Sequence, residues 1–181
     1  MKKIFDQKNM MIFGAAIFIA VLSRLTNHHW NFTAVGAAAF AFALLFSNDK
    51  KMFFIPLLSL FVSDLFLGLH DTMLFVYGGY MLALVPFILI AANSSKLQKV
   101  LTVLSGSLIF FVVSNFGVWA VGQLYPQTVA GLIETYVMGL PFYRNQFLSD
   151  IMLTPALFYV FKMAYSYQLA AKSAQDNRSK I

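Results

Sequence analysis

The chain has 181 residues, of which 60% are hydrophobic, 17% aromatic and only 11% charged. Average soluble domains carry roughly 25% charged residues, so this composition excludes an ordinary soluble globule. The formal net charge is +6, but the basic residues flank apolar runs instead of forming a basic face, and nucleic acid is not an expected partner. The absence of cysteine excludes a disulfide framework and a thiolate metal site.

Six apolar stretches predict helices that cross a membrane. A hydrocarbon core about 30 Å thick requires about 20 helical residues, or fewer where the protein itself shields the helix ends. We therefore predict an all-α fold, a polytopic membrane protein with six transmembrane helices that forms a single domain over residues 1–181. The expected spans are residues 10–25, 34–46, 52–69, 73–92, 100–122 and 146–167.

Two segments depart from a simple run of long spans. The second span is short and rich in alanine, and small side chains permit close helix packing, so we expect a buried central helix there. The segment 123–145 is mixed in polarity and contains Pro126 and Pro141. A long structured loop with a partial helix is the prediction for this segment.

The positions of lysine and arginine predict the orientation. With six spans, both termini share one side, and that side holds eleven of the thirteen basic residues, leaving only Arg24 and Arg144 for the other. Positively charged loops stay in the cytoplasm during insertion, so both termini are expected to be cytoplasmic. The expected location is the bacterial inner membrane, with the lipid bilayer as a partner.

Polar and aromatic side chains that could bind a ligand gather on the opposite, outer side. An ionisable residue at membrane depth faces the bundle interior and is by default a functional candidate. The alternative is structural: ion pairs between helices for Asp64, Arg144 and Asp150, and interfacial anchors for Trp30 and Trp119. The predicted substrate-binding residues are His28, Trp30, Asn31, Asp64, His70, Asn115, Trp119, Tyr125, Arg144, Asn145 and Asp150.

The motifs of the common enzyme classes do not occur. The sequence contains no P-loop, H-E-x-x-H or G-x-S-x-G motif, and no set of residues specifies a reaction. We therefore predict a binding component that is not an enzyme and has no resident cofactor. Transport by such a protein requires a partner or an ion gradient as its energy source.

A group of motifs, together with the six spans, resembles one family of transport proteins. The first span carries an Ala-x-x-x-Ala pattern at Ala16 and Ala20. The more specific motifs are Ser23-Arg24, Asn31-Phe32-Thr33, Ser63-Asp64-Leu65, Gly68-Leu69-His70, Ser114-Asn115-Phe116-Gly117-Val118-Trp119, Pro141-Phe142 and Ser149-Asp150. This set is similar, over about residues 22–155, to S components of energy-coupling factor (ECF) vitamin transporters, in the group that includes the cobalamin-binding S component.

The resemblance implies a function, partners and a docking face. It implies that the chain binds a small-molecule vitamin for uptake, that two separate ATPase subunits hydrolyse ATP, and that Ala16 and Ala20 dock on an ECF coupling subunit. Cobalamin or a related corrinoid is the favoured ligand. The cobalamin-binding relative ligates cobalt with a cysteine in an outer loop; here His70 lies in the corresponding loop, and its imidazole is a good cobalt ligand. Another vitamin or a precursor is the alternative ligand.

A second class of protein also fits six spans without an enzyme motif. A membrane scaffold, such as a rod-shape morphogenesis subunit, binds proteins and no small molecule. A scaffold has no need to gather histidine, tryptophan, asparagine and acidic residues on one side of the membrane. A bound ligand distinguishes the two functions.

Overall fold

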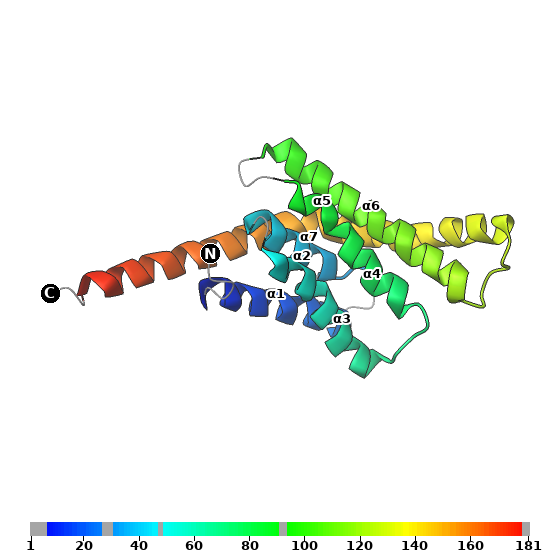
Figure 1. Cartoon of the computed structure of the whole chain (residues 1–181), viewed down its shortest axis with the longest axis horizontal. Coiled ribbons are helices and arrows are strands. Elements are labelled where there is room, and N and C mark those ends of the chain that lie inside the picture. The colour runs from blue at the N-terminus through cyan, green and yellow to red at the C-terminus, as the bar shows by residue number, and fades with distance from the viewer. Residues whose placement is uncertain (1–6, 27–30, 47–48, 91–93, 179–181) are drawn as a thin grey trace.

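The computed structural model describes residues 7–26, 31–46, 49–90 and 94–178, and all regular structure in these ranges is helical. The predicted all-α class is confirmed. The helices pack into one bundle that a hairpin of two long helices extends at one end (Figure 1). They are α1 (Gln7–Thr26), α2 (Val35–Leu45), η1 (Lys50–Phe53), α3 (Phe54–Leu67), α4 (Met73–Ala83), α5 (Val85–Ile88), α6 (Lys96–Val121) and α7 (Val129–Arg178).

The centre of the bundle is α2, which contacts α1, α3, α5, α6 and α7. Its residues from Val35 to Leu44 are all buried, which confirms the predicted buried central helix. Alanine supplies five of its eleven residues, in the sequence VGAAAFAFALL. Because a methyl group projects little from the backbone, neighbouring helices approach α2 closely on every side.

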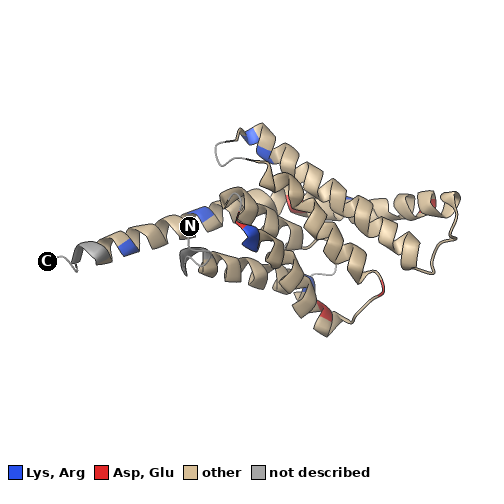
Figure 2. Cartoon of the chain, viewed as in Figure 1, with Lys and Arg blue, Asp and Glu red and all other residues tan. Residues whose placement is uncertain are grey.

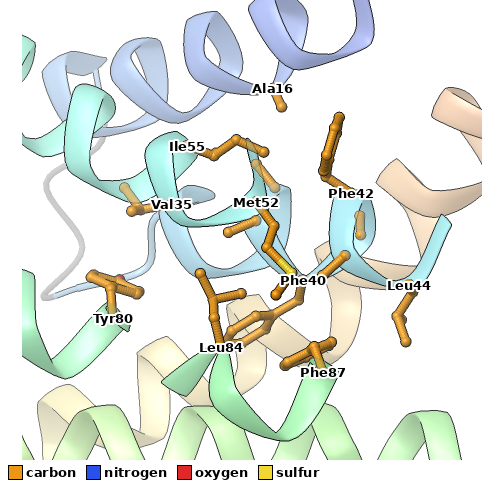
Figure 3. Packing of buried hydrophobic residues seen from close by; sticks show 14 of the residues in the cluster. Ala16, Val35, Phe40, Phe42, Leu44, Met52, Ile55, Tyr80, Leu84 and Phe87 are labelled. Carbon is orange, nitrogen blue, oxygen red and sulfur yellow. The ribbon is translucent and has the colours of Figure 1, made fainter. Parts of the chain in front are cut away.

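Two phenylalanines on α2 fill the space that the alanines leave. The Phe40 ring stacks on Phe87 of α5, with 4.8 Å between ring centroids. Phe42 lies 6.1 Å from Phe13 of α1 in an edge-on arrangement. Figure 3 shows Phe40 and Phe42 among Met52, Leu84 and other side chains of a single hydrophobic cluster. Alternation of very small and very large side chains is what gives such a core its density.

Local sequence explains where α3 ends and where the fourth predicted span breaks. Gly68 ends α3 with a φ of 102°, a left-handed conformation that glycine adopts without steric cost. The fourth predicted span is divided into α4 and α5 at Leu84. Pro86 lies two residues later, and it lacks the backbone N–H that would continue the helix.

The prediction of a long loop over 123–145 is wrong. The connection after α6 is short, and α7 runs unbroken for 50 residues through Pro141 and Pro155. Packing against α6 offsets the backbone hydrogen bonds that proline removes: the Tyr143 ring stacks on Phe111 at 4.4 Å, and the Tyr136 hydroxyl donates to the Val112 carbonyl at 2.9 Å. Helix α7 is therefore about 75 Å long at 1.5 Å per residue, more than twice a bilayer core.

Charge is distributed along the long axis of the bundle. The start of α1 and the end of α7 lie at the same end, and the lysines of α6 and of the C-terminal half of α7 lie toward it (Figure 2). By length and composition, two helices in the described ranges suffice to cross a membrane, Lys96–Val121 and Val129–Gln175. Met10–Thr26, Val35–Leu45 and Met73–Ile88 are shorter apolar helices.

The predicted docking face on α1 requires a correction. Ala16 and Ala20 are both 0% exposed, and they belong to the core cluster of the chain itself. Figure 3 shows Ala16 pointing inward from α1 toward the part of the core that holds Ile55 and Phe42. The small residues serve close packing of α1 on α2 and α3, so they are not available to another subunit.

We expect Ala16→Leu to destabilise the fold. The added side chain has no space in a filled core, and overpacking of this kind costs about 1–3 kcal/mol. The measurement is the melting temperature of the detergent-solubilised protein. Its matched control is Ala15→Leu on the exposed side of the same helix, which should change the free energy of unfolding by no more than about 0.5 kcal/mol. Equal melting temperatures for both variants would contradict the inward orientation of Ala16.

Candidate functional site

A cavity of about 490 Å³ lies at the end of the bundle opposite the chain termini. It is enclosed by the last turn of α1, the segment that leads into α2, and parts of α3, α4, α6 and α7. Small-molecule sites in proteins usually have volumes of about 300–1,000 Å³. The described polar lining residues are Arg24, Asn31, Thr33, His70, Tyr80, Ser114, Asn115, Tyr125, Thr135, Tyr143 and Gln146.

Aromatic rings form much of the wall between α4, α6 and α7. Tyr80 of α4 lies against Phe110 of α6, with centroids 4.0 Å apart, and both residues line the cavity. Phe111, the next residue of α6, stacks on Tyr143 of α7. Aromatic rings beside a few polar groups are the usual composition of a small-molecule site.

The strongest electrostatic feature is an ion pair in the cavity wall. Arg24 Nη1 lies 2.7 Å from Asp64 Oδ1 and donates to Ser63 Oγ at 2.8 Å. The Tyr77 hydroxyl donates to Asp64 Oδ2 at 2.8 Å. The Asp64 side chain is only 1% exposed, whereas Arg24 is 18% exposed and reaches the cavity. Removing one partner of such a buried pair typically costs about 3–5 kcal/mol, because the other charge remains without compensation.

Backbone and hydroxyl contacts hold the segment before α2 against its neighbours. Ser23 Oγ donates to the Ala20 carbonyl at 2.7 Å and accepts from the Ala34 N–H at 2.8 Å, which connects the last turn of α1 to the start of α2. The Ser149 hydroxyl on α7 donates to the Thr33 carbonyl. Asn31 has a φ of 70°, which asparagine tolerates better than most residues. These contacts position Asn31 and Thr33 at the cavity edge.

His70 follows the glycine that ends α3 and lines the cavity. Its Nδ1 lies 2.8 Å from Thr72 Oγ1, and its Nε2 lies 3.9 Å from Asp64 Oδ2, beyond hydrogen-bond distance. Within the described ranges, no group of three His, Cys, Asp or Glu side chains is arranged to hold a metal ion. Ligation of a corrinoid cobalt by His70 alone stays a prediction.

The structure brings four of the eleven predicted site residues to the cavity: Asn31, His70, Asn115 and Tyr125. His28 and Trp30 lie outside the described residues. The other five, Asp64, Trp119, Arg144, Asn145 and Asp150, do not line the cavity. Asn115 is constrained by the contact between α6 and α7: its Nδ2 donates to the Phe111 carbonyl at 2.9 Å, and its Oδ1 lies against Gly139.

Trp119, Arg144 and Asn145 lie away from the lining for different reasons. Trp119 Nε1 donates to the Pro126 carbonyl at 3.0 Å, and its own carbonyl accepts from Gln127 Nε2, so this residue fixes the turn between α6 and α7. Arg144 is exposed and Asn145 is partly exposed on α7. Because α7 is helical here and not a loop, these two residues project from faces that the cavity does not use.

Asp150 belongs to a buried polar stripe beneath the cavity. Gln146, Asp150 and Thr154 recur every four residues on one face of α7, and all three are buried. Gln146 Nε2 lies 3.4 Å from Asp150 Oδ2. The other carboxylate oxygen lies against Gly36 in the first turn of α2, where the positive end of the helix dipole favours an anion. Asp150 thus connects α7 to α2 and supports the cavity floor from below.

Sequence reasoning missed several residues that the fold places in the cavity, chiefly Arg24, Tyr80, Tyr143 and Gln146. Arg24 is one of two basic residues on the predicted outer side, and this isolation is the signal that could have identified it. Gln146 precedes Asp150 by one helical turn. For Tyr80 and Tyr143 the sequence gives no signal, because tyrosine within an apolar helix is common in membrane proteins.

The described residues form an all-helical bundle of membrane-type composition with a polar-lined cavity at one end. The chain belongs to a family of unknown function (DUF6580), whose model matches residues 5–173. No curated protein and no solved structure matches the chain.

Gly36→Ala tests the contact between α2 and α7 below the cavity. A Cβ at this position would lie 2.5 Å from Asp150 Oδ1 and 3.4 Å from Tyr80 Cε1, so the buried carboxylate would have to shift. We expect a loss of about 1–3 kcal/mol in the free energy of unfolding, measured by chemical or thermal denaturation. Gly14→Ala is the control, because nothing lies within 4 Å of its new Cβ and alanine favours helix by up to about 1 kcal/mol. If both variants gain stability, the contact is not as close as described.

Proposed function

We propose that the chain is a six-span membrane protein that binds a vitamin-sized small molecule at its outer face for uptake, as an S component of an ECF transporter does. The observation that carries this proposal is the cavity of about 490 Å³ at one end of the bundle, where polar side chains and aromatic rings converge. A scaffold protein has no need of such a cavity. The resemblance of the sequence motifs to S components supports the same class.

The position of the cavity supports capture from outside. It lies at the end of the bundle opposite the chain termini and the lysines of α6 and α7. Under the positive-inside rule, the lysine-rich end belongs on the cytoplasmic side of a bacterial inner membrane, and the cavity then faces the outside. Helix α2 is too short to span a bilayer by itself, at about 16 Å for eleven residues. Its burial among the other helices removes that requirement.

The volume of the cavity bears on the substrate. It lies in the lower half of the range for drug-sized ligands, and a corrinoid with its side chains and nucleotide is much larger than a drug-sized molecule. The volume therefore favours a compact vitamin or precursor. A corrinoid would require the α6–α7 hairpin to move away from α4.

Energy for uptake would come from other chains. The sequence contains no P-loop, so ATP hydrolysis would belong to two ATPase subunits that act through a membrane coupling subunit. The buried Ala16 and Ala20 do not offer that subunit a surface in this conformation. The docking face must therefore lie elsewhere on the exterior.

The topology can be tested with single cysteines in this naturally cysteine-free chain. Lys96→Cys and Glu134→Cys both replace exposed residues, at opposite ends of α6–α7. We expect a membrane-impermeant thiol reagent added to intact cells to label position 134 and not position 96. Position 96 should react after the membrane is opened. Labelling of position 96 in sealed cells would reverse or remove the proposed orientation.

Ligand binding can be tested by filling the cavity. Protein purified in mild detergent would be denatured for mass spectrometry of any released molecule, and its thermal stability would be measured with a panel of water-soluble vitamins. A ligand at 100 times its Kd should stabilise the protein by about 2.7 kcal/mol. Ser114→Phe places a ring at the cavity wall and should abolish both signals, whereas Ser105→Phe on the exposed side of α6 should retain them. Absence of any ligand signal from the unmodified protein would favour the scaffold function.

A further inference from the structure

We infer that the ligand of this cavity carries a carboxylate or phosphate group, and that the guanidinium of Arg24 binds that oxyanion. This inference rests on the proposed binding function and adds the chemical class of the substrate. Its observations are the hydrogen-bonding pattern of Arg24, the support beneath it and the charge of the lining.

The guanidinium has donors that no described residue uses. Arginine presents five N–H donors in a rigid, planar fork. Nη1 makes the contacts with Asp64 and Ser63, and within the described part of the chain Nε and Nη2 make no hydrogen bond or ion pair. Arg24 is a lining residue of the cavity, so these remaining N–H groups are the ones available to a ligand. A planar pair of N–H groups matches the two oxygens of a carboxylate or a phosphate.

The support beneath Arg24 holds the fork in place before a ligand arrives. One carboxylate oxygen of Asp64 forms the ion pair with Arg24, and the other accepts a hydrogen bond from the Tyr77 hydroxyl. Ser63 Oγ donates to the Ser59 carbonyl of its own helix at 2.7 Å. The acid is 1% exposed and cannot reach a ligand itself. A side chain already ordered by its neighbours loses little conformational entropy on binding, which increases affinity.

The charges of the lining favour an anion over a cation. The described lining includes Arg24 and His70 and contains no Asp or Glu. Asp64 and Asp150 contact the lining residues Arg24 and Gln146, but each acid is 1% exposed and does not line the cavity. His70 Nε2 is 3.9 Å from Asp64 Oδ2, so a second nitrogen group flanks the same carboxylate on the cavity side. In a site partly shielded from water, such interactions are stronger than at an exposed surface.

The test uses inorganic phosphate and acetate as probes, so it does not depend on the identity of the vitamin. The full chain in mild detergent is titrated with phosphate or acetate, and its melting temperature is compared with chloride at equal ionic strength. We expect a saturable rise in the unmodified protein. Arg24→Lys keeps a cation beside Asp64 but loses the fork, and it should weaken the apparent affinity for phosphate by at least about tenfold.

Two further variants separate binding from folding. Arg24→Gln combined with Asp64→Asn removes both charges together, so no buried charge is left uncompensated, and the double variant should fold yet show no response to phosphate. Arg144→Gln removes the exposed arginine of α7, which does not line the cavity, and should respond like the unmodified protein. The inference is overturned if the unmodified protein shows no response beyond chloride, or if Arg24→Lys responds equally well.

Added lipid distinguishes the two sources of an oxyanion. Phosphatidylglycerol and phosphatidylcholine are compared in mixed micelles. A rise in melting temperature that requires phosphatidylglycerol and is absent with phosphate and acetate would overturn the inference that the ligand is soluble. Failure of the inference is also distinguishable from failure of the proposed function. Vitamin binding that Ser114→Phe abolishes and Arg24→Lys leaves intact would retain the function and remove the oxyanion. A response to phosphate without binding of any vitamin would retain the oxyanion site and remove the proposed vitamin-binding function.

Discussion

The burial of a short, alanine-rich helix at the centre of the bundle is the constraint on which the rest of the structure depends. Methyl side chains let α1, α3, α5, α6 and α7 all approach α2, and its two large rings fill the remaining gaps. Because α2 is about 16 Å long, it occupies only part of the depth of the bundle. The space beyond its first turn, where Val35 lines the wall, is the cavity. Close packing and the cavity therefore have one origin.

Two buried acids support the wall of the cavity. Asp64 lies behind Arg24, and Asp150 lies against the first turn of α2 beneath Gln146. Neither acid reaches the cavity, yet each fixes a residue that does. A buried ion pair contributes little net stability compared with apolar packing, but loss of one partner is costly. Such pairs hold a side chain in one orientation, which is what a selective site requires.

Composition and periodicity predicted much of the fold and part of the site. The apolar stretches predicted α1, α2, α3 and α6 to within a few residues, and the fourth stretch corresponds to α4 and α5 together. The alanines predicted the buried helix. The stretch 123–145 could not be assigned correctly, since proline and mixed polarity usually indicate a loop. In the structure most of this stretch is helical, and Tyr136 and Tyr143 pack it against α6. Among the site residues, Asn31, His70, Asn115 and Tyr125 were predicted and Arg24 was not.

The sequence by itself determined the helical class, the approximate helix positions and the asymmetry of lysine between the two ends, because each depends on residues near one another in the chain. The tertiary structure decided which faces meet. It turned Ala16 and Ala20 inward, although the same pattern suits an exterior contact equally well. It also brought Arg24 into contact with Ser63, 39 residues later in the chain, and with the next residue, Asp64. Helix periodicity specifies the faces of one helix, whereas the choice of partner for each face depends on the packing of the whole bundle.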